Sequence, residues 1–426
     1  MEHHPVVVVG AGLAGLTAAN HLLDAGRAVT VIETRSHVGG RARTDTVDGF
    51  RLNLGPHALY RDGHGMHVLR ELDIETSGWN VPLDDSAAVV DDRLALLPVG
   101  PTSLLRTRWL GWRGKLRVGR LLGGLPSLDA SAWASTTVDD FLASEVPEPR
   151  AADLVRALAR LTTYSNRPDI ASAGALIEQL QGATGSGVRY LHGGWQGLAD
   201  QLRDRALHRG ADVRTGVAVQ DLRRTDAGFV VETDAPLRAG TVVLAVAPAA
   251  ADRLLGGGTG LVEAAGPEVV ASVLDLGLDR VAGRRFVLGV DRPHYLSRHA
   301  PAAELAPEGA SLVSAMRYGE PEAGPREGKA VLLDLADRAG IAPQRIVMER
   351  YLHRVVVAGG LPLAARGGLA GRPGVEVPGV PGAFVAGDWV GGDGVLADAA
   401  LASGRAAARA IIGRAAPTAT VGTSAP

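Results

Sequence analysis

Apolar positions at the start of the chain form one continuous run, then a helical period, then a second run. Val6–Val9 are four consecutive valines, the pattern of a strand that is buried on both faces in a parallel sheet. A helix is predicted after them that ends near Ala25, with Gly26 as its stop. A second strand is predicted over residues 28–32 and closes on Glu33. This order predicts a strand–helix–strand unit of the α/β class at the beginning of the chain.

The middle of the chain alternates between helical and strand periods. Helical spacing occurs in four ranges, at 138–142, 151–161, 171–180 and 198–209. Strand patterns follow in three ranges, at 213–222, 229–233 and 241–247. The second half of this region therefore returns to the α/β character of the N-terminal segment.

The region from 265 to 362 is mostly β in pattern. Strands are predicted at 269–276, 285–290, 311–318 and 346–357, with one helix near 329–339. This alternation predicts an antiparallel sheet with one face on a ligand cavity. Near the end of the chain, residues 383–389 are predicted to form a buried strand, and a helix is predicted from just after Gly394 to about Ile412. Residues 415–426 are small, polar and unpatterned, which predicts a disordered tail.

Length and composition restrict the class of protein. A chain of 426 residues is too long for one ordinary core and fits two intimately joined domains. The hydrophobic fraction of 46% and charged fraction of 21% are ordinary for a soluble globular enzyme, and the net charge of -2 gives no reason to expect nucleic acid as a partner. The absence of cysteine excludes disulfides, thiolate catalysis and cysteine metal ligands, and no metal site is predicted.

Targeting signals are also missing from the pattern. The first strand begins at Val6, which leaves no room for a signal peptide, and no stretch of about twenty uncharged apolar residues is present for a membrane span. A cytoplasmic location is therefore expected.

The turn between the first strand and the first helix has the spacing G-x-G-x-x-G. Its residues are Gly10, Ala11, Gly12, Leu13, Ala14 and Gly15. In a dinucleotide site the first glycine permits the tight turn, the second lets a pyrophosphate approach the backbone, and the third lets the helix pack close to the strand. Unpaired amides at the helix start attract the anion.

An acidic residue follows this turn at the distance that a dinucleotide site requires. Glu33 ends the second strand, where a carboxylate can bind the ribose hydroxyls, and Thr34 and Arg35 are the next candidate binding residues. The alternative, a glycine-rich helix start without a ligand, explains the glycines but not Glu33. The motif alone does not distinguish NAD from FAD.

The residues just after this strand–helix–strand unit do distinguish FAD from NAD. They are Val38, Gly39, Gly40, Arg41, Ala42, Arg43 and Thr44. This stretch resembles the GG-R-x-x-T signature of the FAD-dependent amine oxidase and carotenoid (phytoene) desaturase superfamily, and the resemblance is greatest to its desaturase-like members. The resemblance implies that Gly39 and Gly40 give the FAD pyrophosphate access to the backbone, and that Arg41 and Arg43 supply charge. Leu54, Gly55, Pro56 and His57 resemble the segment that passes beside the flavin ring.

A second group of residues near the end of the chain resembles the same family. Gly387 and Asp388 end the predicted strand, and Gly394, Val395, Leu396 and Ala397 lead into the last helix. The resemblance implies that Asp388 meets the ribityl or pyrophosphate region and that the helix start points its amides at the flavin pyrimidine, where reduced flavin carries negative charge. It also implies that Val219 packs on the adenine and that Ala245 closes part of the site, although each is also explained as plain core.

The resemblance implies an α/β fold with a Rossmann-type FAD-binding domain and a second, substrate domain made of an antiparallel sheet and a helical cap. The expected boundaries are 1–83, 189–262 and 375–414 for the FAD-binding domain, 84–188 for the cap, 263–374 for the sheet and 415–426 for the tail.

The implied activity is that of an FAD-dependent oxidoreductase that takes a hydride from a carbon of a largely apolar small molecule, as a desaturase or dehydrogenase does. Two departures from the amine oxidases favour this. Leu396 stands where those enzymes commonly have an aromatic residue, and Lys329 falls on a predicted helix rather than in the substrate sheet. A flavin-dependent amine oxidase, a redox-neutral flavin isomerase, a cofactor-free escort protein and a nicotinamide dehydrogenase are the alternatives. The escort protein conflicts with the intact glycine turn, and the nicotinamide enzyme leaves Gly387 and Asp388 unexplained.

Three residues are candidates for a catalytic role, and each has a structural alternative. His57 is placed near the flavin by its neighbours. His294 lies in a strand that resembles one reaching the active site in desaturase-like members, although a lone histidine is more often structural. Tyr164 follows a helix in the predicted cap and either faces the cavity or closes the helix end with its hydroxyl in water. The base that accepts the accompanying proton is not assigned.

Residues 104–122 combine cations with large apolar side chains. The cations of this region are Arg106, Arg108, Arg113, Lys115, Arg117 and Arg120, and no acidic residue occurs between 99 and 125. Such a stretch is typical either of a helix with its apolar face packed in the domain or of one that lies on a membrane surface. The expected partners are thus an apolar small molecule and, on the second interpretation, a membrane surface. The oligomeric state is not predicted.

Overall fold

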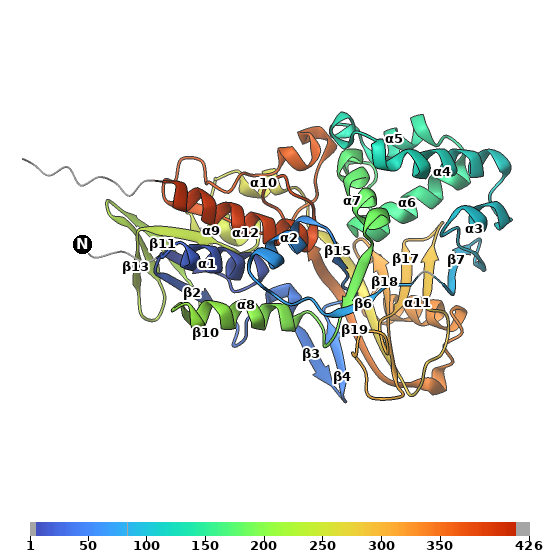
Figure 1. The fold of residues 1–426 in the computed structure, drawn as a ribbon, viewed down its shortest axis with the longest axis horizontal. Helices are drawn as coiled ribbons and strands as arrows, with labels where there is room; N and C mark the ends of the chain where they lie inside the picture. Colours follow the sequence, from blue (N-terminus) through green and yellow to red (C-terminus); the bar gives the residue numbers. More distant parts are fainter. Residues whose placement is uncertain (1–5, 83, 415–426) are drawn as a thin grey trace, which may run out of the picture.

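A computed structural model describes residues 6–82 and 84–414. The tail predicted at 415–426 lies outside the described residues. A parallel sheet with strand order β10-β2-β1-β14-β20 forms the layer on the left of Figure 1. Its strands are β1 (Val6–Val9), β2 (Val29–Glu33), β10 (Asp212–Thr215), β14 (Thr241–Leu244) and β20 (Ala383–Val385). Early, middle and late segments of the chain therefore build one sheet.

Helices cover one face of this sheet. They are α1 (Leu13–Asp24), α2 (His64–Glu71), α8 (Gln196–His208) and α12 (Leu396–Gly413). Helix α1 lies between α12 and α8 (Figure 1). A methyl group on Gly404 of α12 would come within 2.3 Å of the Ala14 carbonyl oxygen, so these two helices are in backbone contact. Val6 and Val8 are the buried valines of β1 that point to this face. They pack against the apolar sides of these helices.

The opposite face of the parallel sheet is covered by short elements. These are α9 (Pro248–Leu254), α10 (Leu261–Ala265) and a small sheet of β11 (Asp221–Thr225), β12 (Gly228–Glu232) and β13 (Leu237–Ala239). Val7 and Val9 of β1 are buried against them with Trp389. Because β1 is covered on both sides, its side chains have no polar face to present, as the run of valines predicts.

A larger, mostly antiparallel sheet forms the second layer. Its order is β19-β15-β18-β17-β16-β7-β8, and only the β16 and β7 pair is parallel. The strands are β7 (Ser86–Val90), β8 (Arg93–Leu96), β15 (Val269–Leu278), β16 (Phe286–Gly289), β17 (His294–Arg298), β18 (Ser311–Tyr318) and β19 (Ile346–Ala358). Helix α11 (Pro325–Arg338) packs on one face of this sheet.

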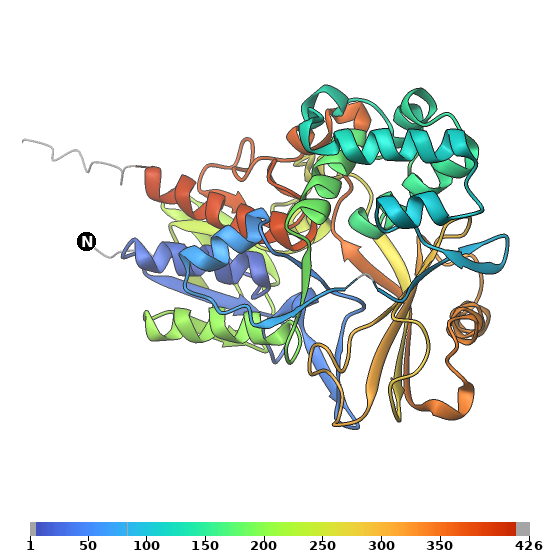
Figure 2. The same ribbon diagram turned by 45° about the vertical axis from the view of Figure 1, so that its right-hand side comes forward.

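A helical cap lies against the other face of the sheet, in teal and green in Figure 2. Its helices are α3 (Pro101–Arg106), α4 (Trp112–Gly124), α5 (Val138–Glu145), α6 (Pro149–Thr163) and α7 (Ala173–Gly185). Phe141, Leu154 and Leu176 of the cap share one buried cluster with Phe286, Tyr295 and Met316 of the sheet. The cap and sheet therefore form one body.

Short strands connect the two layers. They are β3 (Thr44–Val47) with β4 (Phe50–Asn53), and β5 (Leu59–Tyr60) and β6 (Gly78–Asn80), which pair with β9 (Val188–Leu191). Six 3-10 turns complete the described residues: Gly40–Ala42, Leu125–Ser127, Ala130–Trp133, Pro343–Arg345, Ala364–Arg366 and Gly368–Gly371.

The α/β class with a parallel layer, an antiparallel sheet and a helical cap is confirmed, with four local differences. The strand expected at 383–389 ends at Val385. The single strand expected at 213–222 is two strands, because Gly216 turns the chain with a φ of 73°. The strand expected at 241–247 ends at Leu244, since Pro248 begins α9. The segment that begins at residue 84 was expected to be helical. It begins instead with β7 and β8, which extend the larger sheet. The domain boundaries themselves stay a prediction.

Candidate functional site

A cavity of about 1120 Å³ lies where the parallel sheet, the larger sheet and the cap meet. The predicted cofactor residues line this cavity with five exceptions, which are Ala11, Gly15, Arg43, Gly55 and Gly394. The glycine turn, the segment after β2 and the start of α12 thus face one space, although more than 370 residues separate the first of these from the last. Val219 and Ala245 line it too.

The glycines of the turn after β1 differ in what surrounds them. Gly10 has a φ of 101°, and a methyl group there would lie 2.4 Å from the Ala245 carbonyl oxygen. A methyl group on Gly15 would lie 1.9 Å from the Gly10 carbonyl oxygen. At Gly12, by contrast, no atom lies within 4 Å of that position, and the residue lines the cavity. The open space beside Gly12 is where a pyrophosphate approaches the backbone in a dinucleotide site, so the turn fits one.

Helix α1 begins directly at this open space. Gly12 is its N-cap residue and offers no side chain to the first-turn amides. Amides without intrahelical partners and the positive end of the helix dipole attract an anion at this position.

Glu33 is held by the backbone at the end of β2. Its carboxylate accepts hydrogen bonds from the Ala11 amide at 2.9 Å and from the Arg35 amide at 2.9 Å. These bonds fix the carboxylate at the cavity wall, and each of its oxygens retains a lone pair for a ribose hydroxyl. Glu33 thus ends β2, and its contact with a ribose stays a prediction.

Arg41 and Asp388 form a bidentate ion pair across the cavity wall. The two Arg41–Asp388 contacts are 2.6 and 2.7 Å, and Arg41 also donates to the Val357 carbonyl oxygen. Asp388 is 3% exposed and accepts a further bond from the Gly359 amide at 3.0 Å. Burial acts to lower the pKa of Arg41, but the Asp388 carboxylate raises it above its usual range. Both residues were predicted to meet the cofactor, and in this structure they bind each other.

A buried arginine positions the segment that leads into α12. Arg372 donates to the Asp388 carbonyl oxygen at 2.9 Å and to the Gly394 carbonyl oxygen at 2.6 Å. Burial lowers the pKa of Arg372 to about 10, although Asp388 acts in the opposite direction. Leu396, the first residue of α12, has a φ of 56°, a conformation that non-glycine residues adopt only when the surroundings impose it.

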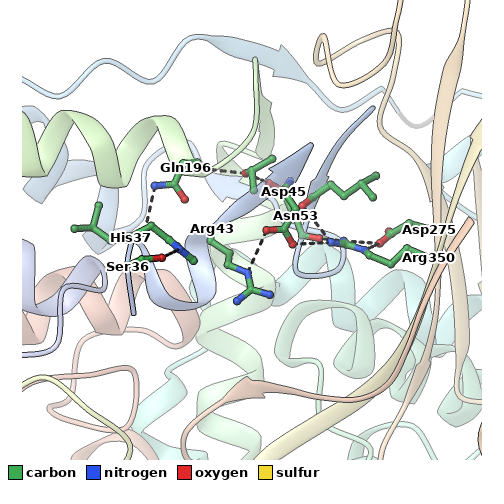
Figure 3. A network of polar contacts seen from close by, with 11 residues as sticks. Ser36, His37, Arg43, Asp45, Asn53, Gln196, Asp275 and Arg350 are labelled. Atoms are coloured by element: carbon green, nitrogen blue, oxygen red, sulfur yellow. Dashed lines mark hydrogen bonds and ion pairs between the residues drawn. The ribbon is translucent and has the colours of Figure 1, made fainter. Parts of the chain in front are cut away.

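Figure 3 shows a polar network that connects β3 and β4 to the larger sheet. Arg350 of β19 contacts Asp275 at 2.7 Å and Asp45 at 3.1 Å, and it also donates to the Asn53 carbonyl oxygen. The Asn53 side chain accepts bonds from Thr44 and from the Trp195 amide. Because Asn53 directly precedes the 54–57 segment, this network holds that segment against the sheet.

The pKa of Asp275, the buried carboxylate of this network, depends on its partners. Burial raises the pKa of Asp275, while Arg350 and the Ser314 hydroxyl lower it. Further along, Gln196 at the start of α8 donates to the Val38 carbonyl oxygen at 3.2 Å (Figure 3). Arg43, predicted to contact the pyrophosphate, lies 3.4 Å from Asp45 and does not line the cavity.

The three catalytic candidates lie in different places. His57 lines the cavity, its Nδ1 lies 2.9 Å from the Gly55 carbonyl oxygen, and burial lowers its pKa. Tyr164 also lines the cavity, and its hydroxyl donates to the Pro56 carbonyl oxygen at 3.2 Å rather than to water. His294 is not a lining residue, and burial lowers its pKa to about 4. Neighbouring strand residues point to opposite faces, so it is Tyr295 that faces the cavity. The structure therefore gives His294 no contact with this site.

A family model with the description "Flavin containing amine oxidoreductase" matches residues 13–263. The chain belongs to this family. FAD is its cofactor, and the family is one of oxidoreductases. The glycine turn, Glu33 and the paired Arg41 and Asp388 are the chain's own residues that fit this cofactor.

The relatives that this chain matches include one named as a dehydrogenase and one named as an oxidase. The chain is 61% identical over 54 residues to the phytoene dehydrogenase of Streptomyces griseus, covering 13% of this chain and 11% of the relative. It is 50% identical over 72 residues to the putrescine oxidase of Kocuria rosea, covering 17% and 15%. Neither match covers two thirds of the relative's own length. An oxidoreductase structure from Methanosarcina mazei aligns with a TM-score of 0.73 at 19% identity, over 96% of this chain and all of the other, which shows the shared fold.

Several lining residues escaped the sequence analysis. Tyr60, Tyr190, Tyr295 and Met316 all line the cavity. One signal was available for Tyr295: Tyr295, Ser297 and His299 alternate with other residues along one strand and its extension, which places three polar side chains on the same face. Tyr60 and Tyr190 lie on short strands whose pairing is not visible in the sequence.

Proposed function

We propose that this chain is an FAD-dependent dehydrogenase or desaturase that removes a hydride from a carbon of a largely apolar small molecule and leaves a double bond. The observation that carries the proposal is the chemistry of the cavity beyond the cofactor residues. Among the described residues, every lining side chain contributed by 97–190 and 286–316 is uncharged. Leucines, valines, tyrosines and Met316 make up most of this wall, so it matches an apolar ligand.

The same wall argues against a small amine as substrate. A positively charged amine in such a cavity requires a carboxylate or an aromatic cage to replace its water. Leu396 gives an aliphatic wall at the start of α12, and Lys329 lies on α11 in an ion pair with Glu349, away from the cavity. These features favour the desaturase type of relative over the putrescine oxidase type.

FAD supplies the hydride acceptor when it is bound. The chain's own part is to hold the cofactor with the glycine turn and Glu33, to place His57 and the 54–57 segment through the Arg350 network, and to exclude water with the cap. Tyr164 joins the cap to this arrangement through its bond to Pro56. The acceptor of the accompanying proton is not assigned to any residue.

Anaerobic substrate mixing tests the proposal. We expect the yellow absorbance of the purified holoprotein to be bleached by members of a polyene or terpenoid panel, and to persist with aliphatic diamines and cyclic amines, because the cavity wall formed by 97–190 and 286–316 carries no charge to bind them. Bleaching by amines alone would establish the amine oxidase alternative. Turnover that appears only after prior reduction of the flavin, without net oxidation, would establish the redox-neutral one.

We also propose that the 104–122 region contacts a membrane surface. Leu105, Trp112 and Leu116 are 74%, 71% and 64% exposed, whereas Leu104 and Leu122 line the cavity. Arg106, Arg113, Arg117 and Arg120 are exposed on α3 and α4, and Arg108 is exposed between these helices. Exposed apolar side chains among cations match an anionic lipid surface, and here they adjoin the wall of the apolar cavity. Among the described residues, no helix is long and apolar enough to cross a bilayer.

Vesicle co-sedimentation tests this contact. We expect the holoprotein to sediment with phosphatidylglycerol vesicles more than with phosphatidylcholine vesicles, and salt to weaken the binding. Replacing Trp112 and Leu116 together by serine removes two apolar anchors, each worth about 1.5–3 kcal/mol when buried, so binding falls by about tenfold or more. Trp79→Ser, at another exposed tryptophan on β6, is the matched control and leaves binding unchanged. Equal loss in both variants would contradict the assignment.

A further inference from the structure

The cavity wall contains a chain of hydrogen-bonded side chains that the proposed function does not use. The Tyr295 hydroxyl lies 2.8 Å from the Ser297 hydroxyl, which lies 2.7 Å from His299 Nε2. The Tyr190 ring stacks on the His299 ring with centroids 4.1 Å apart. Tyr190 and Tyr295 line the cavity, whereas Ser297 and His299 do not. This network of side chains thus reaches the cavity wall at Tyr295 and at Tyr190, and the buried Ser297 and His299 connect them behind the wall.

The spacing along the strand explains how this chain forms. Tyr295, Ser297 and His299 are two residues apart and so point to the same side of β17 and its extension. Tyr190 comes from β9, a strand of a different sheet. Two separate segments therefore place tyrosine side chains together in a wall that is otherwise rich in leucine and valine. A polar cluster at this location is costly unless every member is satisfied.

Each member of the chain is neutral at physiological pH. Burial lowers the pKa of His299 to about 3, with a smaller contribution from His57. Burial raises the pKa of Tyr190 to about 12, although side-chain hydrogen bonds with Ser297 and Tyr295 act against that shift. Tyr295 is shifted in the same direction, and burial raises its pKa well above the usual value. A histidine with so low a pKa is a poor proton acceptor, so these groups do not form the missing base.

The proton positions in this chain are free to reverse. With a proton on His299 Nε2, the ring donates to Ser297, Ser297 donates to Tyr295, and the Tyr295 hydroxyl proton is left to donate to a ligand or to the neighbouring Tyr190 hydroxyl. With Nε2 unprotonated, the direction reverses, and the Tyr295 oxygen is left to accept. Two neutral tautomers of one histidine therefore let Tyr295 bind either a carbonyl or a hydroxyl.

We propose that Tyr295, with Ser297 and His299 behind it and Tyr190 beside it, forms a subsite for one neutral hydroxyl or carbonyl group on an otherwise apolar substrate. This inference rests on the proposed function, because it names the substrate class of the same cavity. A charged ammonium or carboxylate is excluded at the subsite, since no member of the chain carries a compensating charge. The residues act by binding and orienting the ligand.

A pair of probes of similar shape tests the subsite. 2-Naphthol and 2-methylnaphthalene differ by a hydroxyl in place of a methyl group, and their binding to the purified holoprotein is followed by their fluorescence. A net hydrogen bond of about 0.5–1.5 kcal/mol makes the wild type bind 2-naphthol about threefold to tenfold more tightly. Tyr295→Phe abolishes this preference and leaves the affinity for 2-methylnaphthalene within about twofold.

Tyr351→Phe is the matched control. Tyr351 also forms a contact with a histidine, at 3.2 Å from His353 Nδ1, in the same sheet but away from the cavity. We expect this variant to keep the full preference for 2-naphthol. An equal affinity of the wild type for both probes, or a preference that survives Tyr295→Phe, overturns the subsite while leaving the proposed function intact. Failure of the flavin-loaded wild type to bind either probe counts against the apolar cavity and thus against both proposals.

Discussion

Gly12→Val is expected to fold normally and to lose its flavin. The backbone at Gly12 has a φ of -80°, which any residue adopts, and no protein atom lies within 4 Å of the position where a side chain would start. The space is that of the cofactor pyrophosphate, so the valine competes with the ligand rather than with the protein. Inserting extra carbons into a filled space costs up to about 3 kcal/mol, which is a loss of about 100-fold in affinity.

The flavin absorbance per protein molecule measures the loss of the cofactor. Thermal unfolding of the apoprotein measures whether the variant folds normally. Gly324→Val is the matched control, because Gly324 is also the N-cap of a helix, with a φ of -64° and open space, but lies on the surface at α11. It keeps its flavin. Gly15→Val fails differently, since its side chain starts 1.9 Å from the Gly10 carbonyl oxygen and disrupts the fold itself. Full flavin content in Gly12→Val would show that the cofactor does not pass this turn.

Asp388→Ala is expected to be the most destabilising single change at the site. It leaves the Arg41 guanidinium and the Gly359 amide without their acceptor in a segment that is otherwise buried. Removing one partner of a buried ion pair costs about 3–5 kcal/mol. Because part of Arg41 remains accessible from the cavity, we expect a loss near the lower end, about 3 kcal/mol in the free energy of unfolding.

Denaturant unfolding of the apoprotein measures this loss without any contribution from the ligand. Asp169→Ala is the matched control, because Asp169 also forms a bidentate pair with an arginine, at 2.7 and 2.8 Å, but on the exposed surface of the cap. We expect no measurable change there. If the two variants unfold alike, the Arg41–Asp388 pair does not hold the ends of the chain together.

Features of the fold that depend on local sequence could be predicted. The valine run of β1, the glycine turn and Glu33 lie within 28 residues of one another, and each rests on backbone chemistry that does not depend on the rest of the chain. The turn between β7 and β8 was missed because it consists of Asp91 and Asp92, both with positive φ, where asparagine and glycine are the usual signal. The two strands on either side of this turn were therefore not predicted.

Features that depend on pairing between distant residues could not be predicted. Arg41 and Asp388 were each assigned to the cofactor, because nothing in the sequence indicates that two charges 347 residues apart are in contact. His294 was the candidate in this strand, whereas its neighbour Tyr295 lines the cavity, because a step of one residue along a strand reverses the face. Arg350 of β19 was not singled out, because its role comes from contacts with three other strands, β3, β4 and β15.

The order in which the parallel sheet is assembled has a consequence for biosynthesis. The chain emerges from the ribosome with its N-terminus first, so β1 and the glycine turn exist long before β20 and α12 are made. Until β20 and α12 are in place, Arg41 has no Asp388, and α1 lacks one of the two helices that pack against it. We therefore expect stable loading with flavin only after these elements have emerged, and a ribosome-stalled chain that ends before residue 383 would have no complete pocket to fill.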